Sequence, residues 1–301
     1  MTGIAGRCDR IAANMTAFAP NSFEYEGCRL AYDVEGSGPP VIFIQGVGVH
    51  GRGWAPQIEG LRSRFTCLCF DNRGMARSQP AARPISVEQM AADALALMDR
   101  ERWESAHLVG HSLGGPIAMQ MALDHPARVR SLSLLCTVAR GADATRLSWR
   151  LLSVGLRSRI GPRAARRRAF LELVMPPGSV TRSGAAQAAS ELAELFGHDL
   201  ADQPEIAMPQ LRALRRFDAT SRLSHLASIP TLVVSAAHDP IAPPRFGRAL
   251  ADGVPGAKFV EIEDASHGLP IQHAARVNGV LRDHVEAVEA GRSLGRPAEV
   301  F

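Results

Sequence analysis

The chain has 301 residues, with 34 basic and 30 acidic side chains, a formal net charge of +4 and 46% hydrophobic residues. This composition is ordinary for a soluble globular protein, either one large domain or a core domain with an insertion. The absence of any run of 18 apolar residues, and of basic residues alternating with aromatics, argues against a membrane span and against nucleic-acid binding.

The five cysteines and the first twenty residues bear on the location of the protein. Cys67 and Cys69 alternate on one expected strand and should face the same way, which suits buried thiols better than a disulfide. No continuous apolar stretch of the kind found in a secretory signal occurs near the N-terminus. Together these features favour a reducing, cytoplasmic location.

The N-terminal third begins with a loose arm and a hairpin. We expect residues 1–20 to form the arm, and Phe23 to Glu35 to form the hairpin around Gly27-Cys28. The run Val41 to Ile44 is then fully apolar, which is typical of a central parallel strand covered on both faces. Gln45-Gly46-Val47-Gly48 follows directly, and glycines at a strand end let backbone amides approach a ligand closely.

The next segments alternate between apolar strands and amphipathic helices. Phe65 to Phe70 indicates a strand, which ends in the polar turn Asp71-Asn72-Arg73-Gly74. Ser86 and Gln89 form a capping box before a helix with apolar residues at helical spacing. Because this alternation continues from residue 41 to 135, the sequence predicts a mostly parallel, doubly wound α/β sheet, with ligands at the C-terminal ends of its strands.

A buried strand and a helix are joined by Gly110-His111-Ser112-Leu113-Gly114. This is the G-x-S-x-G pattern of a nucleophile elbow, which places a serine at the tip of a strained turn. A serine hydroxyl is a weak nucleophile, so it must be held rigidly and exposed to a base. Side chains at Gly110 and Gly114 would collide in such a turn. The pattern can arise by chance, but its strand and helix context favours a true elbow with Ser112 as the nucleophile.

Residues 139–220 interrupt the alternation and indicate an inserted α-helical cap over the sheet. Helical stretches such as Leu147 to Leu156 and Ala185 to Phe196 are separated by prolines. Ten arginines accompany two acids between Arg140 and Arg182, whereas six acids accompany three arginines from Ser183 to Thr220. A solvated face with nearby counter-charges is the commoner origin of such a pattern, and attraction of an anionic substrate is the alternative.

The strand pattern resumes at Thr231 to Ser235 and again at Lys258 to Ile262. Asp239 and His267 lie in the loops that follow these two strands. Acyl transfer by a serine needs a histidine to take its proton and a carboxylate to orient that histidine. Asp264 and the other histidines fit loop, core or surface positions better, and His111 is expected to point away from Ser112.

With these pieces in place, the sequence resembles the α/β-hydrolase superfamily from about Phe23 to Val288, as a serine esterase-like member with a helical cap. The chain order Ser112, Asp239, His267 matches the order of the family's triad. The resemblance implies that the backbone amides of Val47 and Leu113 form the oxyanion hole. No cluster has metal-ligand spacing and no phosphate-binding glycine loop follows a strand, so no metal and no cofactor are expected.

At three positions this chain differs from other members of the family. Haloalkane dehalogenases and epoxide hydrolases use an aspartate at the elbow, where this chain has Ser112. Cofactor-free haloperoxidase-like members usually have Met after the serine, where this chain has Leu113. Gln45-Gly46 replaces a frequent His-Gly, which need not abolish activity because the oxyanion donors are backbone amides.

The sequence therefore predicts a serine hydrolase that cleaves a small apolar carboxylic ester through an acyl-enzyme intermediate. The expected core comprises residues 21–138 and 221–301, and the expected cap comprises residues 139–220. The same triad also serves thioesters, lactones and the C–C bonds of vinylogous 1,5-diketones, and the sequence does not choose among them. A non-catalytic ligand-binding member of the fold is the rival from another class, and the complete triad argues against it. The oligomeric state stays open.

Overall fold

A single sheet organises the protein in the computed structural model, which describes residues 21–82, 84–144, 149–181 and 184–294. The expected arm at residues 1–20 lies outside the described residues. The strand order is β1-β2-β4-β3-β5-β6-β7-β8, antiparallel for the pairs β1–β2 and β2–β4 and parallel from β4 onward. The strands are β1 (Asn21–Tyr25), β2 (Cys28–Glu35), β3 (Pro40–Ile44), β4 (Thr66–Phe70), β5 (Ala106–His111), β6 (Val129–Leu135), β7 (Thr231–Ala236) and β8 (Lys258–Ile262).

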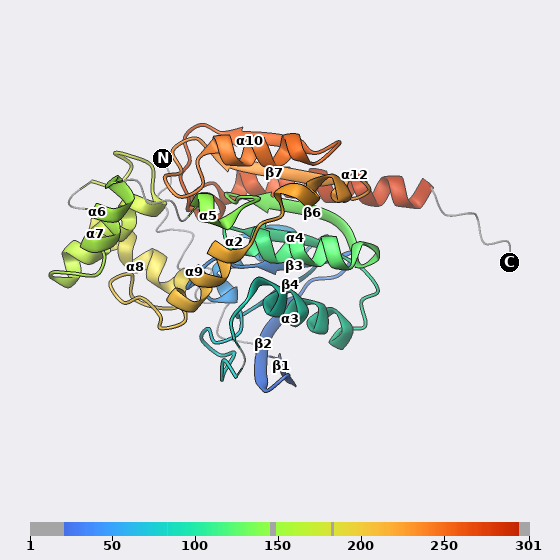
Figure 1. Ribbon diagram of the computed structural model, residues 1–301, viewed down its shortest axis with the longest axis horizontal. Helices are drawn as coiled ribbons and strands as arrows, with labels where there is room; N and C mark the ends of the chain where they lie inside the picture. Colours follow the sequence, from blue (N-terminus) through green and yellow to red (C-terminus); the bar gives the residue numbers. More distant parts are fainter. Residues whose placement is uncertain (1–20, 83, 145–148, 182–183, 295–301) are drawn as a thin grey trace, which may run out of the picture.

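Helices cover both faces of this sheet, as the fully apolar strands predict. Along β3, Ile42 and Ile44 point to one face, and Val41 and Phe43 point to the other. The first face packs against α3 (Val87–Arg100), α4 (Gly114–Asp124) and α10 (Pro244–Gly253), and the second packs against α2 (Ala55–Leu61) and α12 (Ala274–Leu294) (Figure 1). The predicted doubly wound, mostly parallel α/β architecture is confirmed. The shorter helices are η1 (Gly51–Trp54), η2 (Pro126–Arg128), η3 (Thr220–Leu226) and α11 (Leu269–Gln272).

A helical insertion, defined here as residues 139–220, lies between β6 and β7. Its described helices are α5 (Gly141–Ala144), α6 (Trp149–Arg157), α7 (Arg163–Val174), α8 (Ala185–Phe196) and α9 (Ala207–Arg216). Helices α6, α7 and α8 gather beyond one edge of the core, on the side opposite the far end of α12 (Figure 1). None of the helices in the described ranges has the length and apolarity needed to cross a membrane.

The two ends of the helical insertion are joined by backbone contacts. Arg140 and Asp218 form an isolated antiparallel bridge. Beside it, the Gly141 amide donates to the Phe217 carbonyl at 3.0 Å, and the Ala219 amide donates to the carbonyl of Ala139 at 2.9 Å. The chain therefore leaves the core and returns to it at the same place.

The polar turn that follows β4 braces the loop after β3. Asp71 accepts a hydrogen bond from the Gly51 amide at 2.7 Å, and the Asn72 side-chain amide donates to the Gln45 carbonyl at 3.1 Å. Arg73 reaches in the other direction, where its guanidinium donates twice to the Asp93 carboxylate on α3. The turn thus connects the β3 loop, the β4 end and helix α3.

The Arg73–Asp93 pair is a stability test for this bracing, because neither side chain is exposed to solvent. Arg73→Met leaves a buried, unpaired carboxylate and should lower the free energy of unfolding by about 3–5 kcal/mol. The double variant Arg73→Met/Asp93→Leu removes both charges and should recover most of that loss. Urea unfolding of the two variants and the wild type measures both effects, and a double variant no more stable than the single one would contradict the account.

Candidate active site

Ser112 lies where β5 turns into α4, in a conformation that a non-glycine residue rarely adopts. Its φ of 53° falls in the left-handed region. The Ser112 amide donates to the carbonyl of Leu135 at 3.0 Å, and the Thr137 hydroxyl donates to the carbonyl of Ser112 at 2.7 Å. Hydrogen bonds from β6 and the residues after it therefore hold the turn, and the half-buried Ser112 side chain stays accessible.

The two elbow glycines have no room for a side chain. A Cβ on Gly110 would lie 2.3 Å from the Gly114 carbonyl oxygen, and a Cβ on Gly114 would lie 2.1 Å from the carbonyl oxygen of Ile44. Both contacts are with backbone atoms, which cannot move aside cheaply. The backbones of β5, α4 and β3 therefore meet closely around Ser112.

The side chains of Ser112, His267 and Asp239 form one chain of hydrogen bonds. His267 Nε2 lies 3.0 Å from Ser112 Oγ, and His267 Nδ1 lies 2.8 Å from Asp239 Oδ2. His267 and Asp239 are 7% and 3% exposed. They follow β8 and β7, so the carboxyl ends of neighbouring parallel strands bring these distant residues together.

Asp239 is arranged to stay ionised. Burial alone would raise the pKa of Asp239, but His267 and the amides of Ala242 and Ile241 bring that pKa below its ordinary value. The buried Cys136 thiol also faces the carboxylate, and burial together with Asp239 raises the pKa of Cys136 well above its usual range. A neutral thiol and a charged carboxylate are therefore the stable forms.

The competing candidates lie elsewhere. Asp264 has a side chain that is 70% exposed and pairs with Arg276. His238 is exposed, and the buried His107 contacts Ser131 and Glu289 with its two ring nitrogens. Of the carboxylates and histidines weighed from the sequence, the described structure brings Asp239 and His267 to Ser112.

The loop after β3 lies directly against the elbow. A Cβ on Gly46 would be 3.0 Å from the Ser112 Cβ, so Val47, the next residue, is close to the nucleophile. Within the described residues, the backbone amides of Val47 and Leu113 donate no hydrogen bond to the protein. Two unengaged amides on either side of a serine can stabilise a negative oxygen.

Residues of the helical insertion contact the loop after β3. The Gly48 amide donates to the side-chain oxygen of Gln210 on α9 at 2.9 Å, and Nε2 of His198 lies 2.8 Å from the Gly48 carbonyl oxygen. Gln210 is fully buried. The sequence offered no signal for these contacts, because Gln210 and His198 lie in no recognisable motif and only the folded chain brings them to Gly48.

The insertion also contacts the loop that carries His267. The amide of Gly268 donates to the Val174 carbonyl at 2.9 Å. The side-chain nitrogen of Gln272 donates to the same carbonyl and lies 3.0 Å from the Met175 sulfur, while its oxygen accepts from the Ser266 amide. Gln272 therefore links the end of α7 to the two residues that flank His267.

His111 packs against His267 rather than standing apart from the site. The sequence places the His111 side chain away from Ser112 but does not reveal this contact. Its Nε2 donates to the His267 carbonyl at 2.9 Å, and the two ring centroids are 4.9 Å apart. Burial, followed by the neighbouring His267, lowers the pKa of His111 to about 3. His111 is therefore a neutral support for the His267 loop.

His111, Cys136 and His267 are the described group that comes nearest to a metal-ligand set. Their ligand atoms lie within 4.8 Å of one another. Both ring nitrogens of His267 are already engaged by Ser112 and Asp239, and Nε2 of His111 is engaged by the His267 carbonyl. Holding a metal here would break the hydrogen-bond chain of the site.

Comparisons with known proteins agree with this fold. A family model described as alpha/beta hydrolase fold matches residues 39–274. A relative from Azorhizobium caulinodans named as a carbamate hydrolase, RutD, is 32% identical over 79% of this chain and 88% of its own. A Mycobacterium tuberculosis relative named as a non-heme bromoperoxidase, BpoC, is 30% identical over 87% of this chain and 99% of its own. The enol-lactonase structure from Burkholderia xenovorans LB400 has a TM-score of 0.73 and 25% identity, and the match covers 88% of this chain and 100% of that one.

The neutral His111 makes stability depend on pH. The pKa of His111, about 3, lies below the ~6.5 of an unfolded histidine. At pH values between the two, residue 111 is therefore protonated in the unfolded chain and neutral in the native protein. Stability should therefore fall in acid. Between pH 7.5 and pH 5.0, the wild type should lose roughly 1–2 kcal/mol more of its unfolding free energy than His111→Gln does. Urea unfolding at both pH values tests this, and equal losses would contradict it.

Proposed function

Because the chain belongs to the α/β hydrolase family, we propose that it is a serine hydrolase that cleaves a carboxylic ester through an acyl-enzyme intermediate. The observation that carries the proposal is the hydrogen-bond chain from Ser112 through His267 to Asp239. A strained, accessible serine next to a histidine with a buried carboxylate partner is the arrangement that activates a hydroxyl.

In the first half of the reaction, Ser112 Oγ attacks the ester carbonyl carbon while His267 Nε2 takes the hydroxyl proton. Asp239 orients the imidazole and stabilises the imidazolium that forms. The carbonyl oxygen becomes negative and accepts hydrogen bonds from the amides of Val47 and Leu113. The tetrahedral intermediate then collapses, the alkoxide receives the proton from His267, and the acyl group stays on Ser112.

In the second half, a water molecule takes the place of the alcohol. His267 accepts a proton from this water as it attacks the acyl carbon, and then returns the proton to Ser112 as the carboxylic acid leaves.

We assign the core to residues 21–138 and 221–301, and we assign the helical insertion, residues 139–220, as the cap over the site.

The similarity to the enol-lactonase favours an ester as the substrate, since a lactone is a cyclic ester. A carbamate is the second candidate, because one relative is named as a carbamate hydrolase and the same steps cleave that acyl group. Matched nitrophenyl ester and carbamate substrates, together with labelling by a fluorophosphonate, distinguish the two activities and identify the reactive serine.

A cytoplasmic location is part of the proposal. The described cysteines are all free and buried: Cys28, Cys67, Cys69 and Cys136. The predicted thiol state of Cys67 and Cys69 is thus confirmed. Burial raises the pKa of Cys67 to about 12, which leaves it an unreactive thiol.

Replacing the nucleophile gives the direct test. Ser112→Ala should lower ester turnover by ~10⁴- to 10⁶-fold, because it removes the covalent step, while unfolding free energy stays close to that of the wild type. Nitrophenyl acetate hydrolysis and fluorophosphonate labelling measure the loss. A purified variant that kept more than about a tenth of the activity would rule out Ser112 as the nucleophile.

The arginine-rich segment should not select for charge. Several of its arginines pair with acids of the same insertion: Arg140 with Asp218, Arg157 with Glu172, and Arg163 and Arg167 with Asp199. As the Debye length falls from ~30 Å at 0.01 M salt to ~8 Å at 0.15 M, kcat/KM should change equally for a neutral ester and a carboxylate-bearing one. A preference for the anionic ester that disappears with salt would show that the insertion steers substrate.

A further inference from the structure

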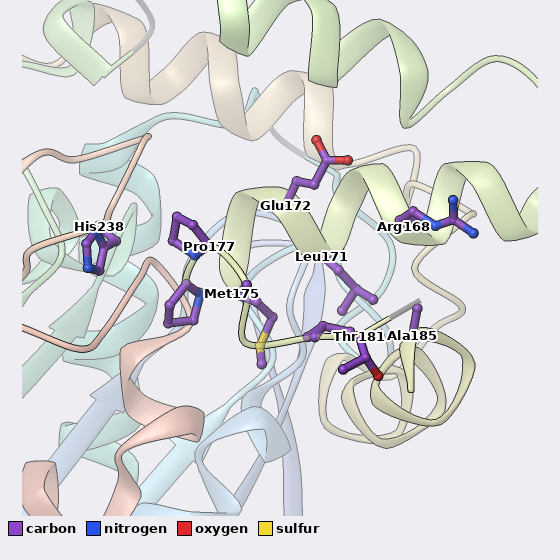
Figure 2. A pocket seen from close by; sticks show the side chains of 11 residues that line it. Arg168, Leu171, Glu172, Met175, Pro177, Thr181, Ala185 and His238 are labelled. Carbon is purple, nitrogen blue, oxygen red and sulfur yellow. The ribbon is translucent and has the colours of Figure 1, made fainter. Parts of the chain in front are cut away.

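A half-open cavity of about 290 Å³ lies between α7, the segment that leads into α8 and the loop after β7 (Figure 2). Figure 2 shows the charged ends of Arg168 and Glu172 pointing away from Met175 and Pro177. The Glu172 carboxylate forms an ion pair with Arg157 at 2.7 Å, which balances its charge at the rim of the cavity. Most of the remaining wall is apolar, formed by Leu171, Met175, Pro176, Pro177, Val180 and Ala185.

The cavity wall is joined to the loop of the proposed general base. Met175, in the wall, lies 3.0 Å from the side-chain nitrogen of Gln272, and its neighbour Val174 accepts a hydrogen bond from Gly268, directly after His267. On another side the cavity is lined by His238, directly before Asp239. The cavity therefore adjoins the His267–Asp239 side of the site.

The oxyanion side of the site is covered by a different part of the insertion. There, Gln210 and His198 contact Gly48, and neither residue lines the cavity. In a serine hydrolase these two sides are chemically distinct. The acyl oxygen turns toward the oxyanion amides, whereas the leaving-group oxygen has to reach the histidine that protonates it.

From this arrangement, and resting on the proposed serine-hydrolase function, we propose that the cavity binds the alcohol half of the ester, as an unbranched or lightly branched apolar chain. The alcohol leaves with the proton carried by His267, while the acyl group stays on Ser112. The cavity has room for about ten groups the size of a water molecule, which corresponds to an alkyl chain of roughly eight carbons with space to spare.

Alkyl acetates from methyl to octyl test the proposal, with acid release followed by titration at constant pH. We expect kcat/KM to rise by up to about fourfold for each methylene group until the cavity is full, because each one leaves water. Ala185→Leu fills part of the cavity and should lower the octyl-to-methyl ratio by about tenfold or more. Ala186→Leu, at an exposed position of the same helix, is the matched control and should leave the ratio unchanged.

Nitrophenyl esters from acetate to octanoate give the opposite arm, because only the acyl chain lengthens. Ala185→Leu should leave the octanoate-to-acetate ratio unchanged. A fall in this ratio with no change in the alkyl acetate series would assign the cavity to the acyl chain and overturn the proposal.

Binding separates this inference from the proposed function. Calorimetric titration of 1-octanol into Ser112→Ala should show binding that is weakened about tenfold when Ala185→Leu is added. If the wild type hydrolyses no ester but octanol binding depends on Ala185, the proposed function fails and the alcohol site stands. If esters are hydrolysed but neither the alkyl acetate ratio nor octanol binding depends on Ala185, the alcohol site is wrong.

Discussion

The left-handed backbone at Ser112 is the constraint on which the rest of the structure depends. A parallel strand turns into a helix there within two residues, Ser112 and Leu113, and this conformation persists only if its surroundings fix it. The Leu135 carbonyl and the Thr137 hydroxyl supply hydrogen bonds, and the backbone at Gly110 and Gly114 is packed too closely for a side chain. The strain is therefore compensated by contacts with the buried middle of the sheet.

The helical insertion is more than a cover, because it makes separate contacts with the two loops that flank the serine. Gln210 and His198 bind the Gly48 backbone on one side. Val174 and Gln272 connect to the loop of His267 on the other. Any movement of the insertion would therefore shift the Gly48 loop and the His267 loop together, so the geometry of the site depends on the position of the insertion.

The sequence was sufficient for the sheet and for Ser112, because both leave local patterns, whereas Asp239 and His267 were predicted from loops after strands together with the resemblance to the α/β hydrolases. Apolar runs mark the strands, and the elbow needs glycines at fixed spacing. The contacts of His111 with His267 and of Gln272 with Val174 leave no such pattern, since each joins segments that only the folded chain brings together. The capping box was half right: the Ser86 hydroxyl accepts from the Gln89 amide, but the Gln89 side chain turns to Glu26 and Asp93.

The bridge between Arg140 and Asp218 has a consequence for how such a protein can diversify. Since the chain leaves and re-enters the core at one point, the insertion is a closed loop whose two ends are joined by backbone hydrogen bonds. Lengthening, shortening or exchanging that loop leaves the strand order intact and costs little in closure entropy. A lineage can thus inherit the elbow unchanged and acquire new substrates by swapping this one segment, as long as the replacement still supports Gly48 and Gly268.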